Sequence, residues 1–386
     1  MADIRILMMG GRRSGKSSIL ASMIHQLSNN INLCKKYIQI TPYGGDDGTA
    51  KSLETKRNNL VSFIETKPTG CHYLVDFDAD NNFNKYYFKA KIPKPEGGTY
   101  GGKVKIEIID CPGECFDTPK SSDSENDVHV GEDSKIAELS KYAQQSDIFM
   151  IIIDTPYLMD SKSDSGMFKT VTRPDSIKNV IQENVAFKRV DDYKKVIFVP
   201  VKCEKWRHNL DAVSQKLQEP NYFGNLMEFL DADPRWSYAI IPALTAGGIE
   251  FSEFAKPLYE KLTFEKCSRL GNSPLYRMAD GSIKMLKQEN VIVDKEQQVF
   301  FPYYSWFVNN ANTYKPENCD QIGLHVWRFI VYKTKINREH SIVPGWLTIK
   351  FPKISRLEEL VRNMEHDGLL KDTENGIVNI RKIETT

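Results

Sequence analysis

The stretch Gly10-Gly11-Arg12-Arg13-Ser14-Gly15-Lys16-Ser17 decides the fold of this chain. It fits the phosphate-binding loop pattern G-x-x-x-x-G-K-[ST], in which glycines let the backbone wrap closely around an anion. The backbone N–H groups, together with the positive N-terminal end of the following helix, favour a bound phosphate chain. The pattern predicts that Lys16 reaches the β- and γ-phosphates and that the Ser17 hydroxyl ligates Mg²⁺.

The sequence around this loop has the order that the motif requires. Ile4–Met9 is an apolar run of strand length, and Ser17–Leu27 has the apolar spacing of a helix. The alternative is a glycine-rich turn between a buried strand and a helix. The residues expected to surround the phosphates are Gly10, Arg12, Arg13, Ser14, Gly15, Lys16, Ser17 and Ser18. Arg12 or Arg13 would also act as a cis arginine finger, or would instead point to solvent or bind a partner.

Strand and helix patterns alternate through the first two-thirds of the chain. The expected strands are Arg5–Met9, Tyr86–Ile92, Lys103–Ile109, Ile148–Asp154, Val196–Val201 and Tyr238–Ile241. The expected helices are Lys16–Leu27, Ala50–Thr66, Ser134–Gln145, Pro174–Phe187 and Leu210–Gln218. Several strands are solid apolar blocks, as in sheets buried on both faces. The alternation predicts a doubly wound α/β fold with a mainly parallel sheet and helices on both faces.

Composition excludes several classes of protein. The chain has 386 residues, a formal net charge of +1 and 40% hydrophobic residues, so it can bury a large core without a field that attracts nucleic acid. No run of eighteen apolar residues predicts a membrane span, and the N-terminal apolar segment leads into the phosphate loop instead of resembling a signal peptide. The seven cysteines are odd in number and include no C-x-x-C pair, which favours reduced thiols in a cytoplasmic protein.

A D-x-x-G sequence follows the third strand. Asp110 suits a second-shell or water-mediated contact to Mg²⁺, and the Gly113 N–H would contact the γ-phosphate. The next residue, Glu114, stands where a water-orienting glutamine is common. A carboxylate there would be repelled by the γ-phosphate unless it were protonated or turned away. The alternative is an ordinary Asp-Cys-Pro-Gly turn.

Two later strand ends predict a base-binding site. Val201-Lys202-Cys203-Glu204 stands where GTPases carry [NT]-K-x-D, with Val and Glu as departures from that pattern. Glu204 would accept hydrogen bonds from guanine N1–H and N2–H₂, and the stem of Lys202 would pack on the base. Pro242-Ala243-Leu244 follows the sixth strand, and a backbone N–H at Ala243 or Leu244 would reach guanine O6. Ordinary charged strand ends are the alternative.

The order of these motifs resembles the P-loop GTPase G domain of the Ras-like and translation-factor-like superclass. The resemblance covers roughly residues 1–260 and implies GTP or GDP, Mg²⁺, and catalysis through Lys16, Gly113 and Arg13. The D-C-P-G-E, K-C-E and P-A-L-x-x-G-G sequences also resemble bacterial "double-GTPase" proteins of conflict systems. The G-domain resemblance divides the chain into a G domain over residues 1–265 and an extension over residues 266–386. The extension would either pack on the G domain or be presented to a partner.

The resemblance further implies a switch I threonine that ligates Mg²⁺. Thr69 lies between the second helix and the second strand and is our choice, with Thr49 and Thr66 as competitors. We expect a molecular switch with slow or partner-stimulated GTP hydrolysis, read by an effector protein and not by a membrane or nucleic acid. An ATP-binding P-loop enzyme and a non-hydrolysing scaffold are the alternatives.

The remaining segments carry weaker expectations. Residues 119–133 and 158–175 are polar and predict irregular loops. Gln297–Val308 is dense in aromatic residues and Ile322–Val331 is strongly apolar, both favouring core, with His325 as a buried histidine. Ile354–Leu370 predicts an amphipathic helix, and Gly376–Ile383 predicts a short strand.

Overall fold

The computed structural model describes residues 3–11, 14–43, 48–66, 71–73, 82–92, 103–116, 130–160, 165–185, 187, 192–254, 266–270, 273–277, 283–285, 292–293, 299–300, 305–309, 313–339 and 354–381. The helices are α1 Lys16–Asn29, α2 Ile31–Lys36, α3 Gly48–Thr66, α4 Val130–Gln145, α5 Thr155–Met159, α6 Ser165–Thr172, α7 Pro174–Asn184, α8 Leu210–Leu217, α9 Gly224–Asp231, α10 Cys319–Glu339 and α11 Ile354–His366, with 3-10 helices η1 Gly113–Phe116, η2 Glu204–Asn209 and η5 Glu374–Gly376. The strands are β1 Ile4–Met9, β2 Gln39–Pro42, β3 Cys71–Tyr73, β4 Asn84–Lys91, β5 Lys103–Asp110, β6 Ile148–Asp154, β7 Lys194–Val201, β8 Trp236–Ile240, β9 Ile249–Phe254, β10 Lys266–Leu270, β11 Ser273–Arg277, β12 Ile283–Met285, β13 Ile292–Val293, β14 Val299–Phe300, β15 Ser305–Asn309 and β16 Val378–Arg381.

An eight-stranded sheet with the order β16-β8-β7-β6-β1-β5-β4-β2 forms the centre of the fold. Strands β5, β1, β6, β7 and β8 run parallel. Strand β4 is antiparallel to β5, β2 is antiparallel to β4, and β16 is antiparallel to β8. Two neighbouring parallel strands cannot be joined by a tight turn, so the chain that connects them crosses over a face of the sheet. The prediction of a doubly wound, mainly parallel α/β fold is confirmed.

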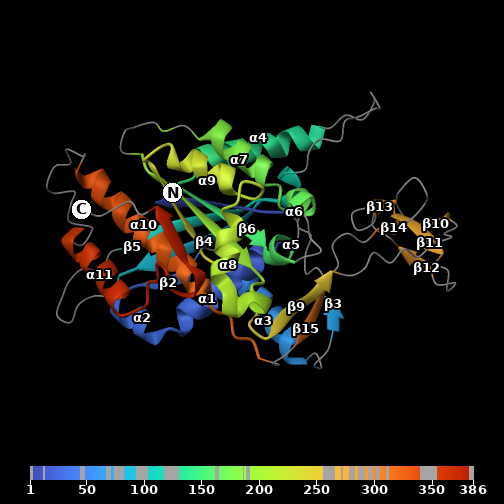
Figure 1. Ribbon diagram of the computed structural model, residues 1–386, viewed down its shortest axis with the longest axis horizontal. Helices are drawn as coiled ribbons and strands as arrows, with labels where there is room; N and C mark the ends of the chain where they lie inside the picture. The colour runs from blue at the N-terminus through green and yellow to red at the C-terminus, as the bar shows by residue number, and fades with distance from the viewer. Residues whose placement is uncertain are drawn as a thin grey trace.

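Alternate residues of the central strands feed two separate cores. Ile6 and Met8 of β1 face a core shared with α1, α10 and α11, whereas Leu7 and Met9 face a core shared with α4, α7, α8 and α9. Figure 1 shows α4, α7 and α9 gathered on one side of the sheet and α10 and α11 on another. All seven residues of β6 are buried, as its unbroken apolar sequence predicts.

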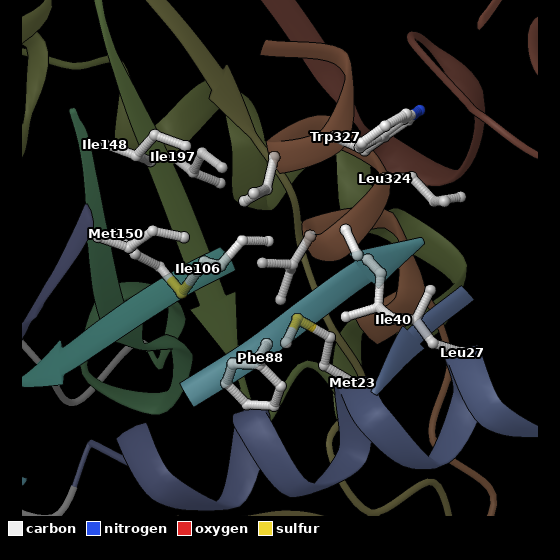
Figure 2. Close-up of a cluster of buried hydrophobic side chains, with 14 of the residues drawn as sticks. Met23, Leu27, Ile40, Phe88, Ile106, Ile148, Met150, Ile197, Leu324 and Trp327 are labelled. Atoms are coloured by element: carbon white, nitrogen blue, oxygen red, sulfur yellow. The ribbon is translucent and has the colours of Figure 1, made fainter. Parts of the chain in front are cut away.

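The core on the α1 side joins the two ends of the chain. In Figure 2, Met23 of α1 lies beside Phe88 and Leu27 lies beside Ile40, while Leu324 and Trp327 of α10 line the other side of the same core. A Cβ on Gly323 would lie 2.7 Å from the Leu27 side chain, so the glycine allows α10 to approach α1 closely. Helices α10 and α11 thus complete the layer that covers one face of the sheet.

The expectation of an irregular loop over 158–175 is wrong. Helices α5 and α6 and the start of α7 occupy most of this range, and residues 161–164 lie outside the described part. The side chain of Phe168 is fully buried and packs edge-on against Tyr222, with ring centroids 4.8 Å apart. One buried aromatic therefore anchors a helix in a segment whose polar composition resembles that of a loop.

Other expected boundaries shift by a few residues. The amphipathic helix of the last third ends at His366 and not at Leu370, and the short strand is Val378–Arg381. The apolar segment 322–331 lies inside α10, while the aromatic segment 297–308 contributes to β14 and β15. Most of the expected loop 119–133 lies outside the described residues, although α4 already begins at Val130. Among the residues described, no helix combines the length and apolarity needed to cross a membrane.

A buried lysine lies between β7 and α10. Lys195 is 4% exposed, and burial, followed by the charge of Arg328, lowers its pKa to about 7. Burial, followed by the charge of Lys195, lowers the pKa of His325 to about 3. The His325 Nε2 atom lies 2.8 Å from the Lys371 carbonyl oxygen, in agreement with the expected buried histidine. The folded protein therefore favours an uncharged amine at position 195.

We expect Lys195→Met to stabilise the protein by about 1–4 kcal/mol near neutral pH, because it replaces a poorly compensated buried charge with an apolar side chain. In the unfolded chain Lys195 has its ordinary pKa of 10.5, whereas in the folded protein its pKa is about 7. The unfolded state therefore binds more protons between about pH 7 and pH 10.5, and the stability of the parent protein rises with pH over this range. Chemical denaturation at about pH 6 and pH 9 should show a larger gain at the lower pH.

The neighbouring lysine gives the control. Lys194 is equally buried, but its Nζ donates to the Ser146 carbonyl oxygen at 2.6 Å. Lys194→Met should lower stability by about 1–3 kcal/mol, because it leaves that carbonyl without its donor. Equal effects of the two substitutions would contradict this account of Lys195.

Candidate functional site

The predicted motifs meet at the carboxyl ends of the parallel strands. The phosphate loop follows β1, Asp110 ends β5, Asp154 ends β6, and Lys202 follows β7. Met8 pairs in register with Asp110, and Met9 pairs with Ile151, so β1 lies between β5 and β6. From β1 the chain first forms β2, β4 and β5 on one side of β1, and it then forms β6, β7 and β8 on the other side of β1. Ligands of doubly wound folds bind at such a switch point.

Two glycines allow the phosphate loop to fold tightly. Gly10 has φ +154° and Gly15 has φ +93°, conformations that side chains rarely adopt. A Cβ on Gly10 would lie 2.6 Å from the Ile152 carbonyl oxygen, so only glycine fits against β6. Arg12 and Arg13 lie outside the described residues, and their phosphate and arginine-finger roles stay predictions.

The helix after the loop begins with its N–H groups available to a ligand. Helix α1 starts at Lys16, and its N-cap residue Gly15 provides no side-chain cap. The Lys16 Nζ donates to the carbonyl oxygens of Gly10 and Gly11, both at 3.1 Å, which places the ammonium group across the loop. Of the other predicted residues, Ser14 precedes the N-cap residue Gly15, and Ser18 lies in the first turn of α1. An uncapped helix end beside a lysine suits an anionic phosphate group.

The predicted metal residues come together. The Ser17 hydroxyl donates to Asp110 Oδ2 at 3.1 Å, bringing the first turn of α1 to the end of β5. Across the described side chains, no group of three or more His, Cys, Asp or Glu residues could hold a metal. Mg²⁺ at a nucleotide site takes one or two protein oxygens and completes its shell with phosphate and water, so a pair of oxygens fits it.

The predicted switch I threonine lies outside the residues that the structure describes. Thr69 falls among residues 67–70, outside the described part, so its metal role stays a prediction. Of its competitors, Thr49 is buried, and its Oγ1 accepts from the Tyr87 backbone N–H at 3.0 Å. That bond attaches α3 to β4 and gives Thr49 a structural role.

The residue beside Gly113 has its charge partly neutralised. Gly113 begins η1, and the Glu114 Oε2 atom lies 3.4 Å from Lys135 Nζ of α4. This ion pair draws the Glu114 carboxylate toward α4. The part that Glu114 takes in hydrolysis stays a prediction.

Sequence reasoning missed Asp154 as a member of the site. It ends β6, is fully buried, and its Oδ2 accepts from Lys202 Nζ at 2.5 Å. Burial raises the pKa of Asp154, while the Lys202 charge opposes that shift. Lys202 itself has φ +60°, a left-handed conformation that is unusual for a lysine. An acidic residue at the end of a wholly apolar strand was the feature that could have indicated this pairing.

Glu204 has partners that the motif did not predict. Its Oε1 accepts from the backbone N–H groups of Ala246 at 2.7 Å and Gly247 at 3.2 Å. Burial raises the pKa of Glu204, and these backbone donors oppose that shift. The carboxylate thus holds the loop after β8, where Ala243 and Leu244 are both buried. One of its oxygens is engaged by the protein's own backbone.

A segment from the end of the chain holds the same loop from the other side. Leu244 and Glu317 exchange two backbone hydrogen bonds, at 3.0 and 2.9 Å, and Lys315 N–H donates to the Ala246 carbonyl oxygen at 3.1 Å. Gly247 has φ +80°, and a Cβ there would lie 1.9 Å from the Lys315 carbonyl oxygen. We call residues 314–318 the clasp segment. No sequence motif indicates this contact.

Helix α1 also contacts the clasp segment. Gln26 Oε1 accepts from the first N–H groups of α10, at Cys319 and Asp320, while its Nε2 donates to the Pro316 carbonyl oxygen at 2.7 Å. The Ser22 hydroxyl donates to the Thr245 carbonyl oxygen at 2.9 Å. Hydrogen bonds therefore connect α1, the loop after β8 and the clasp segment in one network.

Comparison with known proteins adds little to this geometry. No protein-family model matches the chain, and no curated protein matches it. Among solved structures, the signal recognition particle receptor SRb-GTP/SRX complex from Chaetomium thermophilum is 12% identical, covering 63% of this chain and 91% of that chain, with a TM-score of 0.32. The cytosolic domain of L. pneumophila FeoB is 13% identical, covering 62% of each chain, with a TM-score of 0.24. At such scores the fold assignment depends on the chain's own strand order.

Proposed function

We propose that this protein binds a guanine nucleotide with Mg²⁺ at the ends of β1 and β5 and hydrolyses GTP slowly. The observation that carries the proposal is the Ser17–Asp110 hydrogen bond of 3.1 Å beside the Lys16 ammonium group. These three groups stand where a phosphate-bound Mg²⁺ needs a hydroxyl ligand, a carboxylate behind its water shell and a counter-charge.

Each predicted residue has a part in this proposal. Lys16 and the loop N–H groups would stabilise charge on the transferred phosphoryl group, Gly113 would donate its N–H to the γ-phosphate, and Arg13 would add a guanidinium group. Ser17 and Asp110 would hold Mg²⁺, which supplies charge neutralisation when bound. Glu114 is paired with Lys135 and would not orient the attacking water, which is consistent with slow hydrolysis unless a partner assists.

The preference for guanine depends on the loop after β8. Glu204 fixes Ala246 and Gly247 and would present its other oxygen to the base, while Lys202 and the N–H groups near Ala243 and Leu244 would complete the pocket. The alternative is ATP binding, which would not need a free Glu204 oxygen. A partner protein that reads the nucleotide state, a cytoplasmic location and the relationship to double-GTPase proteins belong to the same proposal.

Competition binding is the direct test. Displacement of a fluorescent GDP by GTP, GDP and ATP, with and without Mg²⁺, should give guanine nucleotides at least about tenfold tighter binding than ATP. Phosphate release should be slow and should require Mg²⁺. Equal affinity for ATP and GTP would support the adenine alternative, and tight GTP binding without any phosphate release would support a non-hydrolysing scaffold.

A further inference from the structure

Two cysteines flank the glycine predicted to contact the γ-phosphate. Cys111 follows Asp110 at the end of β5, and Cys115 lies in η1, with three residues between them. Cys111 is fully buried, whereas Cys115 is partly buried at the edge of the same core. The Cys111 thiol donates to the Pro112 carbonyl oxygen at 3.4 Å, and the same oxygen accepts the Cys115 N–H at 3.2 Å. Each thiol also shifts the pKa of the other. A short 3-10 turn thus holds a buried and a more accessible cysteine on one peptide oxygen.

The backbone holds this pair in place. The Cys111 N–H donates to the Met8 carbonyl oxygen at 3.0 Å, which attaches it to the end of β1 just before the phosphate loop. The Cys115 N–H donates to the Pro112 carbonyl oxygen at 3.2 Å, which closes the turn. All five cysteines whose side chains the structure describes are free thiols. Among them, Cys111 and Cys115 are the two that share the Pro112 carbonyl oxygen as an acceptor.

We propose that Cys111 and Cys115 form a reversible disulfide when the protein meets hydrogen peroxide, and that this disulfide weakens triphosphate binding. The Cys115 thiolate attacks one peroxide oxygen, the O–O bond breaks, and hydroxide leaves and takes up a proton as water. The Cys111 thiol then attacks the resulting sulfenic acid, forming the S–S bond and releasing a second water. Two thiols and one peroxide thus become one disulfide and two waters.

The surroundings of Cys115 favour it as the attacking thiol. The neighbouring Cys111 thiol, followed by the charges of Lys135 and Lys16, lowers its pKa, while burial opposes the shift. The other described cysteines lack such a setting. Cys34 donates to the Leu27 carbonyl oxygen at 3.0 Å, and burial raises its pKa. Cys203 and Cys319 are fully buried.

The disulfide would act on Gly113, which lies inside the ring that it closes. An S–S bond is about 2.05 Å long, shorter than any hydrogen-bond contact between two thiols, so the turn must tighten. Cys111 is fixed to β1, so η1 moves and carries the Gly113 N–H with it. Because Gly113 is predicted to contact only the γ-phosphate, triphosphate affinity should fall while diphosphate affinity stays. This second part rests on the proposed function.

Peptide mapping tests the disulfide without any nucleotide. After peroxide treatment of the full chain and alkylation, the tryptic peptide 106–120 should be unalkylated and lighter by two hydrogens, and dithiothreitol should restore both alkylation sites. Full alkylation of both cysteines after peroxide treatment, or conversion of Cys115 to sulfinic acid without a disulfide, would overturn the proposal. This readout stands even if the protein binds no nucleotide at all.

Nucleotide titration tests the consequence. Peroxide should weaken binding of a non-hydrolysable GTP analogue at least about tenfold and change GDP binding less than about twofold. Cys115→Ser should bind both nucleotides like the reduced parent and should not respond to peroxide, whereas the matched control Cys34→Ser should respond like the parent. A disulfide that leaves analogue binding unchanged, or an equal response in Cys115→Ser, would refute the link to Gly113.

Discussion

Lys16→Ala is expected to weaken binding of GTP and GDP about 100-fold, a loss of about 3 kcal/mol. The Nζ atom lies 3.1 Å from two carbonyl oxygens of the phosphate loop, and a bound phosphate chain would replace those weak acceptors with charged ones. Titration of a fluorescent nucleotide measures the loss. The two hydrogen bonds that Lys16 makes in the described part of the chain are partly exposed, so water can replace them and the melting temperature of the nucleotide-free protein should change little.

The control for this prediction is Lys51→Ala. Lys51 is exposed on α3 and is not part of the phosphate-loop motif, and its removal changes the net charge by the same amount. Nucleotide affinity in this variant should match the parent within about twofold. If Lys16→Ala also keeps parental affinity, the loop does not bind phosphate, and the proposed function is wrong.

Glu204→Ala is expected to lower the free energy of unfolding by about 2–4 kcal/mol. The substitution removes the acceptor of the Ala246 and Gly247 N–H groups, which the fold holds at 2.7 and 3.2 Å from Oε1. Buried donors without an acceptor cost more than the hydrogen bond contributes. Chemical denaturation measures the loss directly. Amide hydrogen exchange should also become faster in the loop after β8 than in the other loops at the carboxyl ends of the parallel strands.

Glu204→Gln separates structure from recognition. The amide oxygen can still accept both backbone N–H groups, so stability should stay within about 1 kcal/mol of the parent. The amide NH₂ would replace the oxygen offered to guanine N1–H and N2–H₂, so the preference for GTP over ATP should fall about tenfold. Parental stability with an unchanged preference would show that Glu204 serves only the loop.

The sequence was most informative where one residue type alone satisfies the local geometry. Gly10 and Gly15 have positive φ, Lys16 and Ser17 stand beside Asp110, and unbroken apolar runs became β6 and β7. Such features are local, so spacing and residue type predict them. The parallel sheet followed because the runs alternate with helices.

What the sequence did not predict depends on contacts between distant residues. Helix α6 is anchored by Phe168 against Tyr222, more than fifty positions away, and nothing in its polar neighbourhood indicates that. The partners of Glu204 come from the next strand's loop, and Asp154 gained Lys202 only through strand pairing. Residue type gives the chemistry available to a side chain, and the fold decides which partner receives it.

The clasp segment is synthesised after the parts of the chain that it holds. A ribosome releases the chain from its N-terminus, so the phosphate loop, Glu204 and the loop after β8 emerge before residues 314–318 and α10 are synthesised. Until then, Leu244 lacks its backbone partner, and the side chains of α1 that α10 covers lack that cover. The loop after β8 therefore reaches its final form only late in translation, after the phosphate loop and all the parallel strands have been made.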